Sequence, residues 1–181
     1  MLTDRVVLSV SSKPLVGISS CLLGENVRYD GVLKLDPYLR NEMSRAVSFL
    51  GICPETGSGM TVPREPMDLF ETGGSLRMIT LGSQKDMTGL VSRWIEEKLS
   101  ELSGLNLSGF ILKARSPSCA VDSAKVHTTD GMNSYGRGLF AEALIQRFPQ
   151  LPVAEEEQLH HTAQRDEFLK RVFTVHRLHR R

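Results

Sequence analysis

Short apolar runs alternate with longer amphipathic segments along the chain. The runs at residues 15–19, 49–53 and 107–113 each end in a polar loop, which is typical of strands buried on both faces. Segments 86–102 and 139–148 carry apolar residues at intervals of three and four, which predicts helices. This alternation predicts an α/β protein, a Rossmann-like layered fold with a mainly parallel sheet flanked by helices.

Weaker patterns extend this prediction. Asp36 followed by Pro37 predicts the start of a helix, because aspartate caps helices and proline suits the first helical position. Residues 75–81 and 151–154 predict two further strands. Residues 54–74 are rich in glycine, proline and charge without a sustained period, so we expect a loop there. A loop of that length in a compact domain is usually functional or disordered.

The composition is that of an ordinary soluble domain. Of 181 residues, 40% are hydrophobic and 24% are charged, which excludes a mainly disordered chain, a collagen and a coiled-coil rod. The net charge of +1 gives no general argument for nucleic acid or membrane as a partner. No stretch reaches the ~18 apolar residues of a membrane helix, and the N-terminus lacks the order of a signal peptide. We therefore expect a cytoplasmic protein without a membrane partner.

The C-terminal end differs from the rest. Residues 168–181 contain five Lys or Arg and no acid. Apolar residues recur at helical spacing there, so the segment predicts a helix with one apolar stripe and a basic opposite side. We treat residues 158–181 as a basic helical tail. The apolar stripe consists of Phe168, Leu169, Val172, Val175 and Leu178.

Three cysteines occupy equivalent places in the predicted fold. Cys21, Cys53 and Cys119 each follow a predicted strand and lead into a polar loop. Carboxyl ends of parallel strands meet at one edge of a sheet, so we expect the three thiols to converge there. The alternative is that they are small buried hydrophobes, as free cysteines usually are. An odd count at wide spacing argues against structural disulfides.

Converging thiols predict a metal centre of one of two kinds. A structural zinc site needs four ligands, and His127, eight residues after Cys119, is a candidate for the fourth. A 4Fe-4S cluster is normally bound by four cysteines, so three would leave one iron open as a Lewis acid with an affinity for sulfur. The zinc hypothesis gives a structural or RNA-binding module without catalysis. A third alternative is a sheet domain with unrelated cysteines.

Four motifs follow one another along the chain. They are Cys21-Leu22-Leu23-Gly24 with Arg28-Tyr29-Asp30-Gly31, Cys53-Pro54-Glu55, Pro63-Arg64, and Ser116-Pro117-Ser118-Cys119. In this order they resemble the motifs of the bacterial thiouracil desulfidase family. The resemblance covers residues 13–157, which leaves 1–12 as an N-terminal extension and makes 13–157 a cluster-binding desulfidase domain.

The resemblance implies a non-redox enzyme with a 4Fe-4S cluster held by Cys21, Cys53 and Cys119 and one open iron. Its substrate would be a thiolated uracil, as free base or nucleoside, whose thiocarbonyl sulfur is replaced by oxygen with release of sulfide. The family also uses a carboxylate, which maps onto Glu55, and a serine, for which Ser116 and Ser118 both remain candidates. The alternatives are that Glu55 caps its own turn and that the serines bond their own backbone.

Polar residues between the motifs are candidates for binding the substrate. Tyr29 could stack on a pyrimidine, Asp30 could accept its N3–H, and Arg28 completes this polar cluster. Arg64 could meet a phosphate if the substrate is a nucleotide. The alternative is an ordinary turn in which Arg28 and Asp30 pair for little net energy.

Residues 165–181 carry a second resemblance, to the first helix of a domain that follows the desulfidase domain in fused relatives. Those relatives are associated with removing sulfur from 4-thiouridine in transfer RNA. The resemblance implies that the tail begins a truncated second domain, that transfer RNA is a partner through this tail, and that the chain acts in tRNA modification. The oligomeric state is not predicted.

Overall fold

A computed structural model describes residues 13–180, so the predicted extension 1–12 lies outside the described residues. The main sheet has four strands in the order β2-β1-β5-β8, and all neighbours are parallel. This confirms the predicted α/β class. The strands are β1 (Leu15–Ser19), β2 (Ser48–Ile52), β5 (Leu107–Leu112) and β8 (Val153–Glu155).

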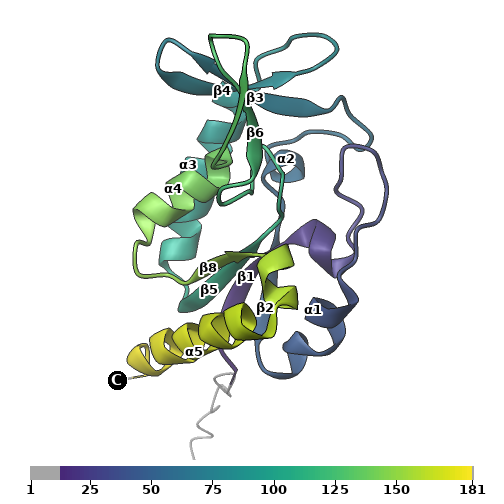
Figure 1. The fold of residues 1–181 in the computed structure, drawn as a ribbon. Helices are drawn as coiled ribbons and strands as arrows, with labels where there is room; N and C mark the ends of the chain where they lie inside the picture. The colour runs from purple at the N-terminus through teal and green to yellow at the C-terminus, as the bar shows by residue number, and fades with distance from the viewer. Residues whose placement is uncertain (1–12, 181) are drawn as a thin grey trace, which may run out of the picture.

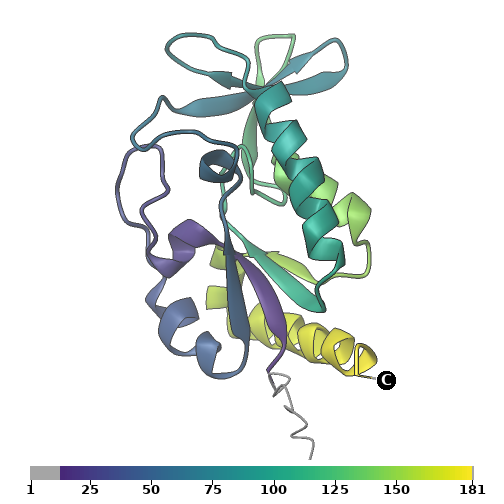
Figure 2. The same cartoon turned by 180° about the vertical axis from the view of Figure 1, so that it is seen from behind.

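Helices cover both faces of the main sheet (Figures 1 and 2). On one face lie α3 (Thr88–Ser103) and α4 (Leu139–Arg147), and on the other lie α1 (Pro37–Asn41) and α5 (Thr162–Leu178). No helix within residues 13–180 combines the length and the apolar character needed to cross a membrane. The remaining helical pieces are α2 (Pro54–Gly57) and the 3-10 turns η1 (Ser20–Leu23), η2 (Met43–Arg45) and η3 (Glu156–His160).

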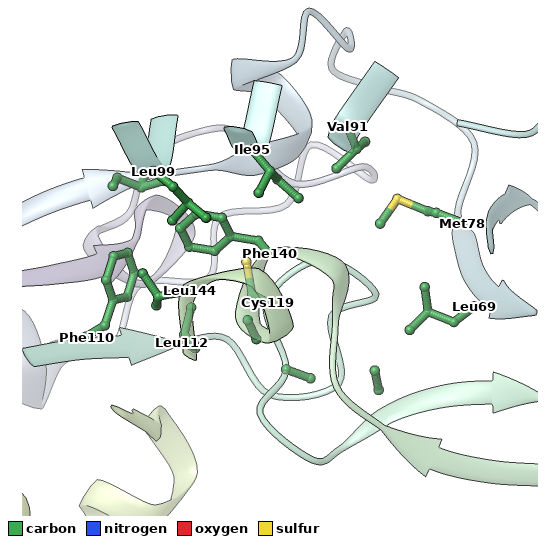
Figure 3. Packing of buried hydrophobic residues seen from close by; sticks show 14 of the residues in the cluster. Leu69, Met78, Val91, Ile95, Leu99, Phe110, Leu112, Cys119, Phe140 and Leu144 are labelled. Carbon is green, nitrogen blue, oxygen red and sulfur yellow. The ribbon is translucent and has the colours of Figure 1, made fainter. Parts of the chain in front are cut away.

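Strand β5 forms the centre of the fold, and all six of its residues are buried. Phe110 and Leu112 pack with Phe140 of α4, in the cluster that Figure 3 shows. Gly109 points toward α5, where an added Cβ would lie 2.7 Å from a Val172 methyl carbon. Glycine at this position therefore allows α5 to lie directly on the sheet.

The C-terminal helix contributes to the core of this domain. Phe168 is 5% exposed and Val172 is fully buried, in one cluster with Val16 and Ile111 of the sheet. The helix therefore has a structural role, separate from the RNA contact predicted for its basic side. The division into residues 13–157 and a separate tail remains a prediction.

Truncating Phe168 should destabilise the protein strongly. Phe168→Ala is expected to lower the free energy of unfolding by about 3–5 kcal/mol, because it removes a buried ring and leaves a cavity under α5. Leu178→Ala on the same helix is the control, since Leu178 is 59% exposed and should change stability by less than about 0.5 kcal/mol. Urea denaturation measures both, and equal effects would contradict the packing of α5.

A second sheet lies beyond the carboxyl ends of the main strands and was not predicted as a unit (Figure 1). The expectation of a loop over residues 54–74 is wrong for β3, which forms there and pairs along its length with β4 through a Gly73-Gly74 turn. Both glycines have positive φ, of 58° and 76°, a conformation that glycine adopts without strain. The order is β4-β3-β6-β7, with β3 (Met67–Thr72), β4 (Ser75–Thr80), β6 (Ala124–His127) and β7 (Asn133–Gly136).

Candidate functional site

The structure brings the three cysteines to one cavity of about 350 Å³. Cys21 lies in η1 after β1, Cys53 follows β2 at the start of α2, and Cys119 lies in the loop after β5. All three are free thiols. The carboxyl ends of adjacent parallel strands thus place three residues that are distant in sequence around one space.

Most of the predicted site residues line the same cavity. Asp30 and Ser118 are the exceptions: Asp30 contacts Arg28 beside it, and Ser118 is fully buried behind Glu55. The predicted residues on the wall, besides the cysteines, are Arg28, Tyr29, Glu55, Arg64 and Ser116.

Glu55 is held at the cavity by side chains from two other segments. Its Oε1 accepts a hydrogen bond from the Ser118 hydroxyl at 2.9 Å. Its Oε2 accepts from Arg64 Nε at 2.9 Å and also from Arg64 Nη2. The carboxylate is therefore fixed in orientation by long-range contacts, in contrast to the alternative that it caps its own turn.

Arg64 joins three segments of the cavity wall. Besides Glu55, it donates to the carbonyl of Val27 at 2.9 Å and to the carbonyl of Thr61 at 3.0 Å. These bonds use four of the five N–H groups of a guanidinium. Only one N–H group of Arg64 remains for the predicted contact with a substrate phosphate. The structure therefore favours a role for Arg64 in holding Glu55 in place.

The two candidate serines have different contacts. Ser116 Oγ accepts from the backbone N–H groups of Ser118 and Cys119, each at 3.2 Å, and so stabilises the turn that carries Cys119. Ser118 Oγ instead donates to Glu55. We therefore expect Ser118 to orient the carboxylate and Ser116 to shape the loop.

Arg28 and Asp30 form the turn that was the alternative to a substrate role. Arg28 donates to both Asp30 oxygens, at 3.1 and 2.7 Å, and Asp30 also accepts from the backbone of Val32 at 3.1 Å. These contacts raise the pKa of Arg28 and lower that of Asp30, so both stay charged. Tyr29, which is 40% exposed, lines the cavity with the Arg28 guanidinium 5.5 Å from its ring centre.

Two of the thiols are strongly shielded from water. Burial raises the pKa of Cys21 to about 12, with the neighbouring Cys53 adding to the rise. Burial also raises the pKa of Cys119 well above its usual value, against an opposing hydrogen bond with Ser19. Cys119 packs in the same hydrophobic cluster as Phe140 (Figure 3). Both thiols are protonated at neutral pH unless a metal displaces the proton.

Comparison with known proteins identifies the family. The model of the family described as 2-thiouracil desulfurase matches residues 16–156, most of the 181 residues. The chain belongs to this family. The uncharacterized protein YbbK of Bacillus subtilis (strain 168) is 30% identical to this desulfurase-family chain over 138 residues, which cover 73% of the chain and 90% of YbbK.

A solved structure also matches this 2-thiouracil desulfurase family member. It is that of TudS, described as a 4Fe-4S-dependent thiouracil desulfidase, with a TM-score of 0.63 and 30% identity. The match covers 83% of this chain and 96% of TudS. These comparisons confirm the resemblance inferred from the motifs. The family match ends at residue 156, so the second resemblance, over residues 165–181, remains a prediction.

In this desulfurase-family fold, His127 does not lie with the three cysteines as the zinc hypothesis requires. His127 lies in β6, where it bonds Asp68 at 2.8 Å and stacks on Phe70, and it does not line the cavity. Within residues 13–180, no three His, Cys, Asp or Glu side chains are arranged to hold a single metal ion. The prediction of a site made of three cysteines and His127 is therefore wrong.

Sequence reasoning did not single out two lysines that line this cavity, the exposed Lys34 and Lys113. Lys113 directly follows β5 and is only 8% exposed. The signal was present, since a lysine directly after a buried strand lies at the same sheet edge as the cysteines. Its ion-pair partner, Glu156, lies 43 residues away in η3, and no local pattern connects the two.

Proposed function

We propose that this chain is an iron–sulfur-dependent desulfidase that replaces the thiocarbonyl sulfur of a thiolated uracil by oxygen and releases sulfide. The observation that carries the proposal is the single cavity lined by Cys21, Cys53, Cys119 and Glu55. Membership of the 2-thiouracil desulfurase family and the likeness to TudS support it.

The donor set fits a cluster better than a single ion. Three free thiols surround one cavity, and thiolates are the ligands of iron–sulfur clusters. In a cluster each cysteine binds a different iron, so the absence of a single-ion arrangement among residues 13–180 is consistent with this assignment. When bound through three cysteines, a 4Fe-4S cluster would supply an iron without a protein ligand, a Lewis acid with an affinity for sulfur.

The residues around the thiols would activate water and orient the base. Glu55 would take a proton from the attacking water at one carboxylate oxygen. Ser118 holds that carboxylate through a hydrogen bond to Oε1, and Arg64 holds it through a hydrogen bond to Oε2. Tyr29, the exposed aromatic residue of the wall, would pack on the face of the pyrimidine.

An anaerobic assay tests this function. Protein purified without oxygen should be brown and should contain iron and acid-labile sulfide. It should release sulfide from 2-thiouracil or from a thiolated uridine. Protein that takes up no iron, or loaded protein that releases no sulfide from any member of that panel, would contradict the proposal.

We further propose transfer RNA as a substrate, with α5 as the contact. Its basic residues Lys170, Arg171 and Arg177 are exposed, as is Arg180 just beyond the end of α5 at Leu178. Phosphate contacts release counterions, so the log–log slope of affinity against salt approaches −1 per contact. Because Phe168 and Val172 are buried in the core, charge changes test this contact more cleanly than deletion of the helix.

Neutralising two of these charges should weaken RNA binding and leave the chemistry intact. Lys170→Gln with Arg171→Gln is expected to reduce the salt slope for transfer RNA by about 2. Sulfide release from free 2-thiouracil should stay unchanged. Arg45→Gln, at a site 74% exposed on η2, is the control. An unchanged slope in the double variant would place the RNA elsewhere.

A further inference from the structure

A buried ion pair stands beside the three thiols. Lys113 Nζ pairs with Glu156, and the two side chains are only 10% and 7% exposed. Removing two charges from water is costly, and a buried pair contributes little net stability compared with apolar residues of similar size. The position of this pair therefore points to a role in the site.

The ammonium, and not the carboxylate, faces the cavity. Lys113 lines the cavity with Cys21, whereas Glu156 does not. Lys113 donates to Glu156 and to the Ala114 carbonyl at 3.1 Å, and the third N–H has no acceptor within residues 13–180. Glu156 is anchored behind it, since its Oε2 accepts the backbone N–H of Ala114 at 2.6 Å.

The neighbouring ion pair has the opposite character. Arg115 and Glu157 also pair between the β5 loop and η3, but their side chains are 62% and 51% exposed. Arg115 also lines the cavity, but water and salt screen its exposed pair, so its field on the sulfur atoms is weaker than that of a buried cation. The two pairs therefore form a natural comparison of a buried and an exposed cation on adjacent stretches of chain.

We propose that Lys113 is a positioning residue of the site, whose fixed ammonium stabilises negative charge on the sulfur atoms in the cavity. This inference rests on the proposed function, because it assigns the lysine to a cluster held by the cysteines. A positive charge near a cluster stabilises its reduced, more negative state.

The reduction potential of the anaerobically loaded, full-length protein tests the proposal. In a dithionite titration, Lys113→Met should disfavour the reduced cluster about tenfold, a shift of ~59 mV to lower potential for one electron. Glu156→Gln should shift the potential upward, because it removes the negative member of the pair. Arg115→Gln should shift it much less than Lys113→Met does, because Arg115 also lines the cavity but its charge is exposed and screened.

The double variant covers the case in which Lys113→Met alone does not fold. Lys113→Met with Glu156→Gln removes both charges and keeps an acceptor for Ala114, a change that is often neutral for stability. Its potential should lie below that of Glu156→Gln, and that difference isolates the ammonium. Equal potentials in these two proteins would overturn the inference, as would shifts of Lys113→Met and Glu156→Gln in the same direction. A wild-type protein that takes up no iron would instead overturn the proposed function itself.

Discussion

Cys53→Ser is expected to abolish iron binding and sulfide release together. A serine hydroxyl is not deprotonated near neutral pH and is a poor iron ligand, so one of three anchoring bonds is lost. The loss of metal affinity should exceed the ~10–100-fold that follows removal of a group supporting a metal ligand. Iron and acid-labile sulfide in anaerobically loaded protein, and sulfide release from 2-thiouracil, measure the effect.

Cys53 is the most informative of the three cysteines to change. It is half-buried and lies outside both hydrophobic clusters, whereas Cys21 and Cys119 belong to them. A loss of iron in Cys53→Ser therefore reports on ligation and not on a collapsed core. His127→Gln is the control and should keep full iron content and activity. A Cys53→Ser protein with the iron content of the wild type would show that the cluster is held elsewhere.

The central strands could be predicted because burial and periodicity are local properties. The run predicted at 15–19 has the bounds of β1, Leu15–Ser19, and β5 ends one residue before its predicted end. A parallel strand covered by helices on both faces reads as an unbroken apolar run. The shared position of the cysteines after such strands was enough to predict their convergence.

The second sheet could not be predicted from local pattern to the same extent. Strand β3 pairs in parallel with β6, joining Leu69 to Val126 across 57 positions of sequence. Its sequence, Met67-Asp68-Leu69-Phe70-Glu71-Thr72, breaks the strict apolar–polar alternation of a strand after three residues and follows a proline-rich stretch, so the local signal is weak. Tertiary pairing between distant segments decides that this stretch is a strand.

The choice of polar partners likewise depends on the fold. Sequence reasoning placed Arg64 on a substrate phosphate and left Ser116 and Ser118 as equal candidates. In the structure Arg64 bonds Glu55, nine residues earlier, and Ser118 reaches Glu55 across 63 residues. Such contacts depend on how loops from different strands meet, which no spacing in a single sequence encodes.

Glu55→Gln is expected to keep the cluster and lose most of the turnover. Glutamine preserves the shape of the side chain, and its carbonyl oxygen can still accept from Arg64, but it cannot take a proton from water. General acid–base assistance is typically worth about 10²–10⁴-fold, so kcat for sulfide release from 2-thiouracil should fall within that range. Iron content and colour should match those of the wild type, which separates this loss from that of Cys53→Ser.

The neighbours of Glu55 provide a graded comparison for this variant. Ser118→Ala removes the hydrogen bond to Oε1 but leaves the carboxylate and its bond to Arg64. It should therefore reduce turnover less than Glu55→Gln does.

Glu55→Gln should also lower the stability of the protein. The side chain of Arg64 is only 9% exposed, so loss of its anionic partner should lower the free energy of unfolding by about 1–3 kcal/mol. Denaturation of iron-loaded protein measures that loss independently of catalysis. A stable, loaded Glu55→Gln protein with near-wild-type sulfide release would show that another group activates the water, because glutamine can form hydrogen bonds but cannot take the proton.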